Sequence, residues 1–400
     1  MPQHILVVGG GVGGTIVANL LARSLHRQEA EISLIDSTGM HAYMPGWLYL
    51  PFNRVETDDS QLIRPERGLL NNQVHLVTGE VQHIDTRNRE LHVRHTLDKD
   101  EIVGTGGASE ATYPYDYLVL ATGARLVLSD LPGLMEGEGK WHHFYEAQAA
   151  LRLREALHRF EGGRIVITVG GIPYRCPPAP LEFTFLLDEW LRKRGLRERT
   201  ELHYLSPLPR VFPIESVAEV ATPLLEERDV KYTVFFNTEA VDAEHRVISS
   251  LEGEEIAYDL LVLVPPHRGA KVIEDSGLGD EQAWLPTDHG TLEVKGLSHV
   301  YALGDATDLP VSKSGSAAHF EARVLAQRLI AVVRGEEPEP EKATYDGEVM
   351  CFLETGRNRA TQLVFNYEHP PRPPRPSQYY HMEKLLFNRA YWHIVPQGLL

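Results

Sequence analysis

The sequence predicts an α/β protein built from two tandem Rossmann-like domains, followed by a C-terminal region with an amphipathic tail. Three observations predict this fold class. A complete glycine-rich strand–turn–helix unit opens the chain, a second such unit begins at residue 164, and segment 258–268 (YDLLVLVPPHR) echoes segment 115–125 (YDYLVLATGAR). The 400 residues are 42% hydrophobic and 24% charged, which suits two or three globular domains.

The first unit carries the full fingerprint of a dinucleotide-binding turn. A strand at 4–8 runs into GxGxxG, formed by Gly9, Gly11 and Gly14, and a helix follows. The first glycine allows the tight turn, the second lets the backbone approach a pyrophosphate, and the third lets helix and strand pack closely. The next strand ends in Asp36, at roughly the 20-residue distance where a carboxylate accepts a ribose hydroxyl. This combination favours a bound dinucleotide over a bare glycine turn.

The segment from 74 to 160 predicts short strands, a buried strand and a helix. Residues 74–85 and 90–97 alternate apolar and polar side chains, as half-buried strands do. Residues 115–124 read as a buried strand that ends in a small-residue turn. A linker rich in glycine and acidic residues (131–140) precedes an expected amphipathic helix at 145–160.

The second unit keeps the pattern of strand and helix but loses the glycines. A strand at 164–169 is followed by a helix from 179, and Gly170 corresponds to Gly9. Ile172 and Arg175 stand where Gly11 and Gly14 would be, so we expect them to block the pyrophosphate and crowd the helix. Pro173 fixes the turn further, and the next strand ends in Ser206 without a carboxylate. The sequence therefore predicts a second Rossmann-like domain with a degenerate nicotinamide site.

Composition excludes several classes of function. A net charge of −17 without a basic run argues against a nucleic-acid partner. No stretch of 18 uncharged apolar residues predicts a membrane-spanning helix, and the strand at 4–8 leaves no room for a signal peptide. Two cysteines fit a reducing compartment rather than a disulfide scaffold, and no metal site is expected. These features favour a protein on the cytoplasmic side of any membrane it meets.

Three motifs resemble a known family. CPPAPLE (176–182), GDATDLPVSKSGSAAHFEA (304–322) and the lone late cysteine Cys351 are similar to those of sulfide:quinone oxidoreductases. They are also similar to the flavoprotein subunit of flavocytochrome c sulfide dehydrogenase; both belong to the glutathione-reductase-like flavoproteins with two dinucleotide domains. The resemblance implies that the first unit holds FAD, which the ATG turn and the late Gly-Asp turn would contact through Thr122, Gly123, Gly304 and Asp305.

The resemblance also divides the chain. It implies an FAD-binding domain at 1–125 and 285–335, the degenerate second domain at 140–270, and a quinone- and membrane-contact region at 336–400. A linker opens at 336, and a rigid proline stretch occupies 370–376.

In the family, one cysteine of a CPP-type loop and one of the C-terminal region form a redox disulfide beside the flavin. The matching positions are Cys176 and Cys351. Hydrosulfide would attack this disulfide and give a persulfide and a thiolate, and the flavin would take two electrons. The other interpretation is a pair of inert buried thiols. Many family members carry a third cysteine after the first return strand, and the chain has none there, which leaves open how the sulfur departs.

Three more residues are candidates for the chemistry. By the resemblance, Lys313 lies near the flavin ring and would stabilise its reduced anionic form; otherwise it is a solvated surface lysine. Glu182 and His319 are candidate proton carriers, although each also suits a purely structural role.

The tail raises the question of the electron acceptor. Met382, Leu385 and Leu386 have helical spacing among aromatic residues, so an amphipathic helix after the proline stretch could lie on a membrane and approach a quinone. The alternative is a tail docked on its own core or on a second subunit of a homo-oligomer. Phe352 and Tyr391 are possible quinone contacts implied by the family.

The expected function is FAD-dependent oxidation of sulfide by a membrane quinone, at the peripheral cytoplasmic face. One alternative is a flavocytochrome-type sulfide dehydrogenase, which would need an export signal that the sequence does not show. Another is a single-subunit NADH:quinone oxidoreductase, which would need the glycines that Ile172 and Arg175 replace. The last alternative is a non-enzymatic sensor that binds flavin.

Overall fold

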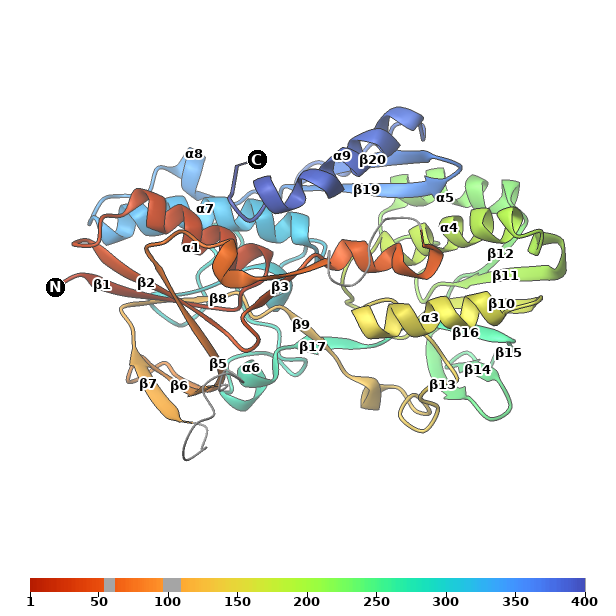
Figure 1. Cartoon of the computed structure of the whole chain (residues 1–400), viewed down its shortest axis with the longest axis horizontal. Coiled ribbons are helices and arrows are strands. Elements are labelled where there is room, and N and C mark those ends of the chain that lie inside the picture. The colour runs from red at the N-terminus through yellow and green to blue at the C-terminus, as the bar shows by residue number, and fades with distance from the viewer. Residues whose placement is uncertain (54–61, 96–108, 400) are drawn as a thin grey trace.

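The computed structural model describes residues 1–53, 62–95 and 109–399. Two sheets lie side by side along the long axis of the molecule, and the C-terminal hairpin and helix extend across both (Figure 1). This α/β architecture confirms the predicted fold class.

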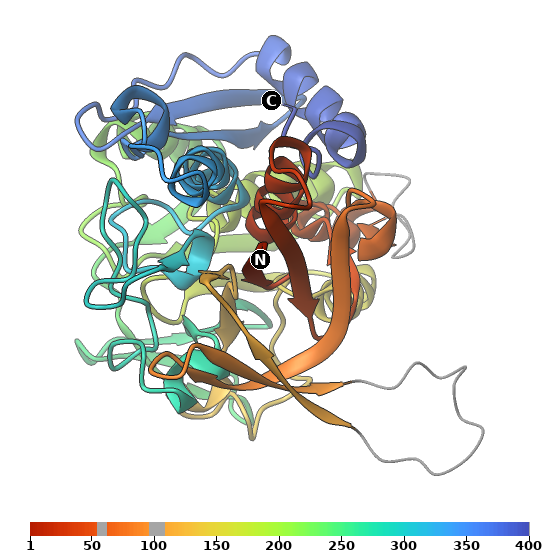
Figure 2. The same cartoon turned by 90° about the vertical axis from the view of Figure 1, so that its left-hand side faces the viewer.

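The first sheet has seven strands in the order β18-β8-β1-β2-β5-β6-β7. Its parallel part holds the opening unit, and β5 leaves it to pair with an antiparallel meander (Figure 2). The strands are β1 (Gln3–Val8), β2 (Ala30–Asp36), β5 (Val74–Asp85), β6 (Glu90–His95), β7 (Glu110–Pro114), β8 (Tyr117–Leu120) and β18 (Val300–Ala302). Helices α1 (Val12–Ser24) and α7 (Gly315–Val333) pack against each other beside this sheet. Residues 96–97 of the predicted strand 90–97 lie outside the described residues.

The second sheet is parallel throughout, in the order β12-β11-β10-β16. Its strands are β10 (Gly163–Val169), β11 (Thr200–Leu205), β12 (Val230–Thr233) and β16 (Leu260–Val264). Helices α3 (Ala147–Arg159), α4 (Ala179–Lys193) and α5 (Glu215–Glu227) belong to this half of the molecule. A small antiparallel sheet of β13 (Thr238–Asp242), β14 (Val247–Ser250) and β15 (Glu255–Ala257) follows β12 along the chain.

A narrow ribbon joins the two sheets. Strand β9 (Ala124–Leu126) follows the turn after β8, and β17 (His267–Gly269) follows β16; they pair antiparallel. The two segments that echo each other in sequence therefore leave equivalent strands and meet in the middle of the molecule (Figure 1). Short elements complete this region: α6 (Lys271–Asp275), β3 (Met40–Ala42), β4 (Ile63–Pro65), η1 (Met44–Leu48) and η2 (Leu50–Phe52).

The C-terminal region is more ordered than the sequence suggested. After α8 (Pro340–Ala343), strands β19 (Val349–Gly356) and β20 (Arg359–Phe365) form a hairpin, and α9 (Gln378–Ile394) follows. The proline stretch is held against the protein: Thr361 Oγ1 donates to the Pro374 carbonyl at 2.6 Å, and Ser216 Oγ donates to that of Pro371 at 2.6 Å. Within the described residues, none of the helices is long and apolar enough to cross a membrane.

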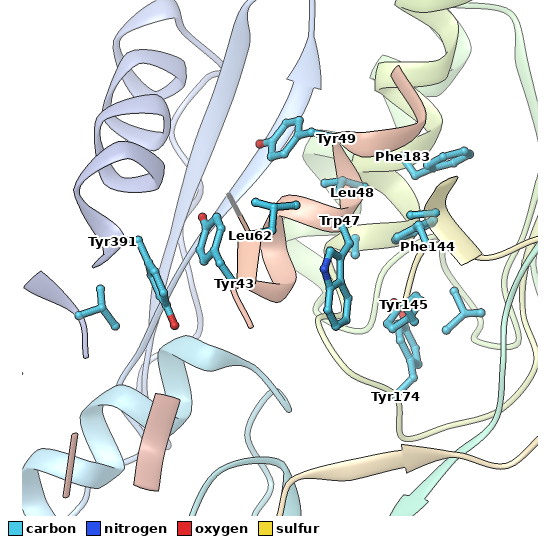
Figure 3. Packing of buried hydrophobic residues seen from close by; sticks show 14 of the residues in the cluster. Tyr43, Trp47, Leu48, Tyr49, Leu62, Phe144, Tyr145, Tyr174, Phe183 and Tyr391 are labelled. Atoms are coloured by element: carbon cyan, nitrogen blue, oxygen red, sulfur yellow. The ribbon is translucent and has the colours of Figure 1, made fainter. Parts of the chain in front are cut away.

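Buried aromatic side chains fill the space between the halves. Figure 3 shows them along segment 43–52: Tyr43 faces Tyr391 of α9, and Trp47 points toward Tyr145. The rings of Phe144 and Phe183 stack at 4.9 Å, and that of Phe52 lies 5.1 Å from Phe183. This packing ties segment 43–52 to α4 and α9, so both halves share one core.

Candidate active site

The first glycine turn fits a dinucleotide and leaves no room for side chains behind it. Gly9 has φ +107°, and a Cβ there would lie 2.3 Å from the Ala121 carbonyl oxygen. A Cβ on Gly14 would lie 2.0 Å from the Gly9 carbonyl oxygen, so helix α1 packs directly against the turn. At Gly11 a Cβ would meet nothing within 4 Å, which is the open space that a pyrophosphate requires.

Two polar groups border this turn. The carboxylate of Asp36, at the end of β2, accepts hydrogen bonds from the backbone N–H groups of Gly10, Thr38 and Gly39 at 2.8–2.9 Å. It is therefore held rigidly beside the glycines. Thr122 Oγ1, in the turn after β8, is buried and has no hydrogen-bond partner among the described residues. A buried hydroxyl without a partner is costly, which fits a bound cofactor at this turn. Gly123, next in the chain, has φ +66° and open space around it.

The Gly304-Asp305 turn lies over a buried carboxyl of α7. Gly304 has φ +70°, and its N–H donates to Glu321 Oε2. Glu321 is fully buried, and its Oε1 has no hydrogen-bond partner in the described part of the chain. Burial, reinforced by the charge of Asp305, raises the pKa of Glu321 to about 8. Sequence reasoning missed this residue, because only the fold brings it beneath the turn.

Lys313 is not a solvated surface lysine. It is buried, its Nζ donates to the Thr307 carbonyl at 2.6 Å and the Asp305 carbonyl at 3.2 Å, and it lies 3.8 Å from the ring centre of Trp284. Burial lowers the pKa of Lys313, and nearby carboxylates, Asp305 first among them, oppose that shift. A buried cation held beside the Gly-Asp turn keeps the predicted flavin contact chemically reasonable.

The second turn is built differently. Between β10 and α4 the chain makes a long loop, 170–178, and a pocket of about 290 Å³ lies beside residues 170–172. Ile172 is 52% exposed in this pocket, where Gly11 of the first unit leaves open space. The expectation that Arg175 crowds the helix is wrong, because α4 begins only at Ala179. The Arg175 guanidinium instead donates to His267 Nε2 at 3.3 Å and the Tyr145 carbonyl at 3.2 Å.

Both cysteines lie beside segment 312–314. The backbone N–H of Cys176 donates to the Lys313 carbonyl at 2.6 Å, and the hydroxyls of Ser314 and Ser312 lie near enough to the Cys351 thiol to lower its pKa. Cys176 has φ +54°, a left-handed conformation that costs a non-glycine residue about 1–2 kcal/mol. Such strain is concentrated at functional sites. Both cysteines are free thiols in the structure.

Burial keeps both thiols protonated. It raises the pKa of Cys351 to about 11 and that of Cys176 further, and the carboxylate of Glu182 adds to both shifts. The charge of Cys351 also raises the pKa of Cys176. The pairing of Cys176 and Cys351 as one redox unit stays a prediction.

Glu182 belongs to a buried ionic cluster that sequence reasoning did not foresee. Its Oε1 accepts from the Glu354 backbone N–H at 2.7 Å and pairs with Lys384 Nζ of α9. Glu354, on β19 with Cys351, accepts a hydrogen bond at 2.6 Å from His381, one turn before Lys384. Burial raises the pKa of Glu182, and the Lys384 ammonium opposes that shift. The sequence feature that could have indicated this cluster is Lys384, a charged residue within the apolar tail.

The remaining candidates have different surroundings. Phe352 follows Cys351 on β19 and is half-buried; adjacent strand residues face opposite sides. Tyr391 is 3% exposed, and its hydroxyl donates to His41 Nε2 at 2.8 Å, so it packs inside the protein rather than on an outer face. His319 is buried on α7, edge-on to Phe320 at 5.4 Å.

Known proteins match this chain over nearly its whole length. The family model of pyridine nucleotide-disulphide oxidoreductases matches residues 3–328. The mitochondrial sulfide:quinone oxidoreductase of Mus musculus is 26% identical over 99% of this chain and 86% of its own length. A type II NADH:quinone oxidoreductase of Staphylococcus aureus is 22% identical over 99% of this chain and 97% of its own length.

A solved structure shares the fold. The sulfide:quinone oxidoreductase of Aquifex aeolicus superposes with a TM-score of 0.81 at 20% identity and covers 99% of this chain and 92% of that one. The family binds FAD, and the open glycine turn and the unpartnered Thr122 hydroxyl fit that cofactor. The protein is therefore an FAD-binding oxidoreductase that belongs to the pyridine nucleotide-disulphide oxidoreductase family.

Proposed function

We propose that the protein oxidises sulfide through a Cys176–Cys351 redox disulfide and passes the electrons through FAD to a membrane quinone. The observation that carries this proposal is that one segment, 312–314, meets both cysteines: the Cys176 backbone N–H donates to the Lys313 carbonyl, and the Ser312 and Ser314 hydroxyls act on the Cys351 thiol. The sulfide:quinone oxidoreductase relatives support the substrates. The domain boundaries and the contacts of Gly9, Gly11, Asp36, Thr122 and Lys313 with FAD are part of the proposal.

The cysteine pair would bind and activate the sulfur. Hydrosulfide attacks one sulfur of the disulfide, the S–S bond breaks, and a persulfide and a thiolate result. FAD, when bound, supplies a two-electron acceptor beside the pair. In sum, each hydrosulfide would give up two electrons and one proton, FAD would take up both electrons and one proton, and the sulfur would stay bound to cysteine sulfur until it is transferred. The hydroxyls of Ser314 and Ser312 would orient Cys351 and stabilise its thiolate, since their hydrogen bonds lower its pKa.

Helix α9 would provide the contact with the membrane. It is docked on its own core through Tyr391, yet Tyr379, Met382 and Leu386 remain 54–65% exposed along its outer side. An apolar stripe on an amphipathic helix suits the membrane interface, with peripheral attachment at the cytoplasmic face. Phe352 remains a possible quinone contact.

Anaerobic reduction of the flavin tests the function. Sodium sulfide should bleach the visible flavin absorbance of the oxidised protein, a soluble quinone should restore it, and NADH should leave it unchanged. Cys176→Ser and Cys351→Ser should each abolish bleaching by sulfide. Bleaching by NADH but not by sulfide would instead establish the NADH:quinone reaction of the Staphylococcus relative, and no response to either would indicate a sensor.

A further inference from the structure

One face of helix α1 is polar although most of it is buried. Thr15, Asn19 and Arg23 are spaced four residues apart, so they lie on the same side of the helix. Thr15 and Asn19 are fully buried. Asparagine is not favoured inside a helix, because its side chain competes for backbone hydrogen bonds. A buried asparagine at this position therefore needs partners outside the helix.

Asn19 joins α1 to two other segments of the chain. Its Nδ2 donates to the Leu69 carbonyl at 2.9 Å and to the Pro396 carbonyl at 2.8 Å, and its Oδ1 accepts from the Asn71 backbone N–H at 2.6 Å. These three hydrogen bonds use most of the bonding capacity of the amide. One of them reaches segment 396–398, which follows α9 and is called the clasp below.

The clasp lies directly on α1. The Arg23 guanidinium donates to the Gln397 carbonyl, and Gln397 Nε2 donates to the Leu69 carbonyl at 2.8 Å. Gly398 has φ +61°, and a Cβ there would lie only 3.2 Å from two side chains of α1. The clasp thus contacts the helix through hydrogen bonds along its polar face and through close packing at Gly398.

The N-terminal end of α1 has no side-chain cap of its own. Its N-cap residue is Gly11, and no acidic side chain lies in the first turn, so the free N–H groups suit the pyrophosphate of FAD. The position of α1 matters, because at Gly14 the helix packs against Gly9 without room for a Cβ. The polar face also reaches this turn, since Thr15 Oγ1 lies 2.8 Å from the Gly11 carbonyl oxygen.

We propose that the clasp holds α1 in the position that FAD binding requires, and that Asn19 and Arg23 are positioning residues of the FAD site. At 1.5 Å per residue, Asn19 lies about 12 Å and Arg23 about 18 Å along the helix axis from Gly11. They act through the helix: without the clasp, α1 tilts on the sheet and its N–H groups leave the phosphate. This inference rests on the proposed placement of FAD at the first glycine turn, but not on sulfide as the substrate.

The rate of FAD release tests the clasp. A chain that ends at Val395 lacks the clasp but keeps α9, and Asn19→Ala removes the hydrogen bonds at the centre of the polar face. Each holoprotein is diluted, and the free flavin is followed by its fluorescence. Loss of a buried hydrogen-bond partner corresponds to about a tenfold change in an equilibrium constant, and such changes appear mostly in the dissociation rate. We therefore expect FAD to leave both variants about tenfold faster.

Two matched variants separate this effect from a general loss of stability. Ser24→Ala, at an exposed position of α1, should release FAD at the unmodified rate. Leu225→Ala removes a fully buried side chain of α5 in the second half, so it should lower the free energy of unfolding without faster release of FAD. Equal acceleration in Leu225→Ala would mean that FAD release follows overall stability, and would overturn the clasp.

An unchanged rate in Asn19→Ala, or in the shortened chain, would also overturn the proposal. If the shortened chain does not fold, Asn19→Ala decides alone.

Hydrogen exchange of the holoproteins gives a second readout. The amide hydrogens of α1 should exchange faster in the shortened chain and in Asn19→Ala than in the unmodified protein, whereas those of β13, β14 and β15 should not change. Equal exchange in α1 would overturn the clasp. If sulfide does not bleach the flavin of the unmodified protein, the proposed function fails, but both readouts remain valid because neither needs sulfide.

Discussion

The two glycine turns of this protein start from the same architecture and end in different chemistry. In both halves a parallel strand is flanked by equivalent neighbours, β2 and β8 around β1, and β11 and β16 around β10. After β1 the helix begins at Val12, whereas after β10 it begins only at Ala179. The longer loop of the second half carries Cys176. The second half thus has a cysteine in the long loop between its first strand and helix, whereas the first half joins them through a short glycine turn.

The protein is packed more tightly behind the first glycine turn than behind the second. In the first half, backbone carbonyls stand where the Cβ atoms of Gly9 and Gly14 would be. In the second half, a Cβ on Gly170, the counterpart of Gly9, would lie 3.0 Å from the Val264 carbonyl oxygen, and one on Gly171 would lie 3.5 Å from Pro266, an ordinary contact. The strands β8 and β16, which pair with β1 and β10, also differ in their surroundings. Strand β8 pairs with β18 on its other side and leads to the turn 121–123, while β16 is the last strand of its sheet and leads to Pro265 and Pro266.

Replacing one glycine by alanine in each turn should give the largest difference between the halves, measured as the flavin content of the protein. Gly14→Ala places a Cβ 2.0 Å from the Gly9 carbonyl oxygen, so helix α1 must move away from the turn. Overpacking of this kind costs about 1–3 kcal/mol, which corresponds to a roughly ten- to hundredfold weaker retention of FAD if it falls on the binding site. The flavin content of the purified protein, read from its absorbance, checks this.

The matched control is Gly171→Ala in the second turn, which should keep its full flavin content. Equal flavin loss in both variants would mean that the second turn also holds a dinucleotide, and would break the comparison. If both variants keep their full flavin content, helix α1 adjusts to the added methyl group and Gly14 does not control FAD binding.

Local signals explain what the sequence could predict. The strand, glycine turn and helix at 3–24 follow from residues close in the chain, and so do β10, α4 and α7. The hairpin β19–β20 and the docking of α9 depend on partners hundreds of residues away, such as His41 for Tyr391 and Glu182 for Lys384. Periodicity describes one face of a helix but not the surface it meets. The sequence therefore left open whether the tail lies on a membrane or docks on its own core, and the structure shows the docked helix, with Lys384 paired to Glu182.

A buried acid supports the first half and should make its stability depend on pH. The pKa of Glu321 rises from 4.5 to about 8 on folding, so the folded state holds a proton that the unfolded state loses in this range. Stability should therefore fall as pH rises from about 4.5 to about 8, by up to about 1.4 kcal/mol per pH unit. Glu321→Gln should flatten this slope.

Urea unfolding at pH 6 and pH 8 measures the effect of Glu321. Glu336→Gln, which alters an exposed carboxyl after α7, should leave the slope unchanged. If the free energy of unfolding still falls with pH in Glu321→Gln, another group causes the pH dependence. The first half would then not differ from the second through this buried acid.

The last expected effect concerns how α9 holds the first half. Tyr391 donates to His41, His41 donates to the buried Glu66 at 3.0 Å, and Thr15 of α1 donates to Glu66 at 2.7 Å. Tyr391→Phe leaves His41 Nε2 buried without a donor and should lower the free energy of unfolding by about 1–3 kcal/mol. Tyr379→Phe, on the exposed side of the same helix, should stay within about 0.5 kcal/mol of the unmodified protein. Since Lys384 joins α9 to the second half, Tyr391→Phe should leave bleaching by sulfide intact; slower bleaching would mean that the two ends of α9 act as one unit.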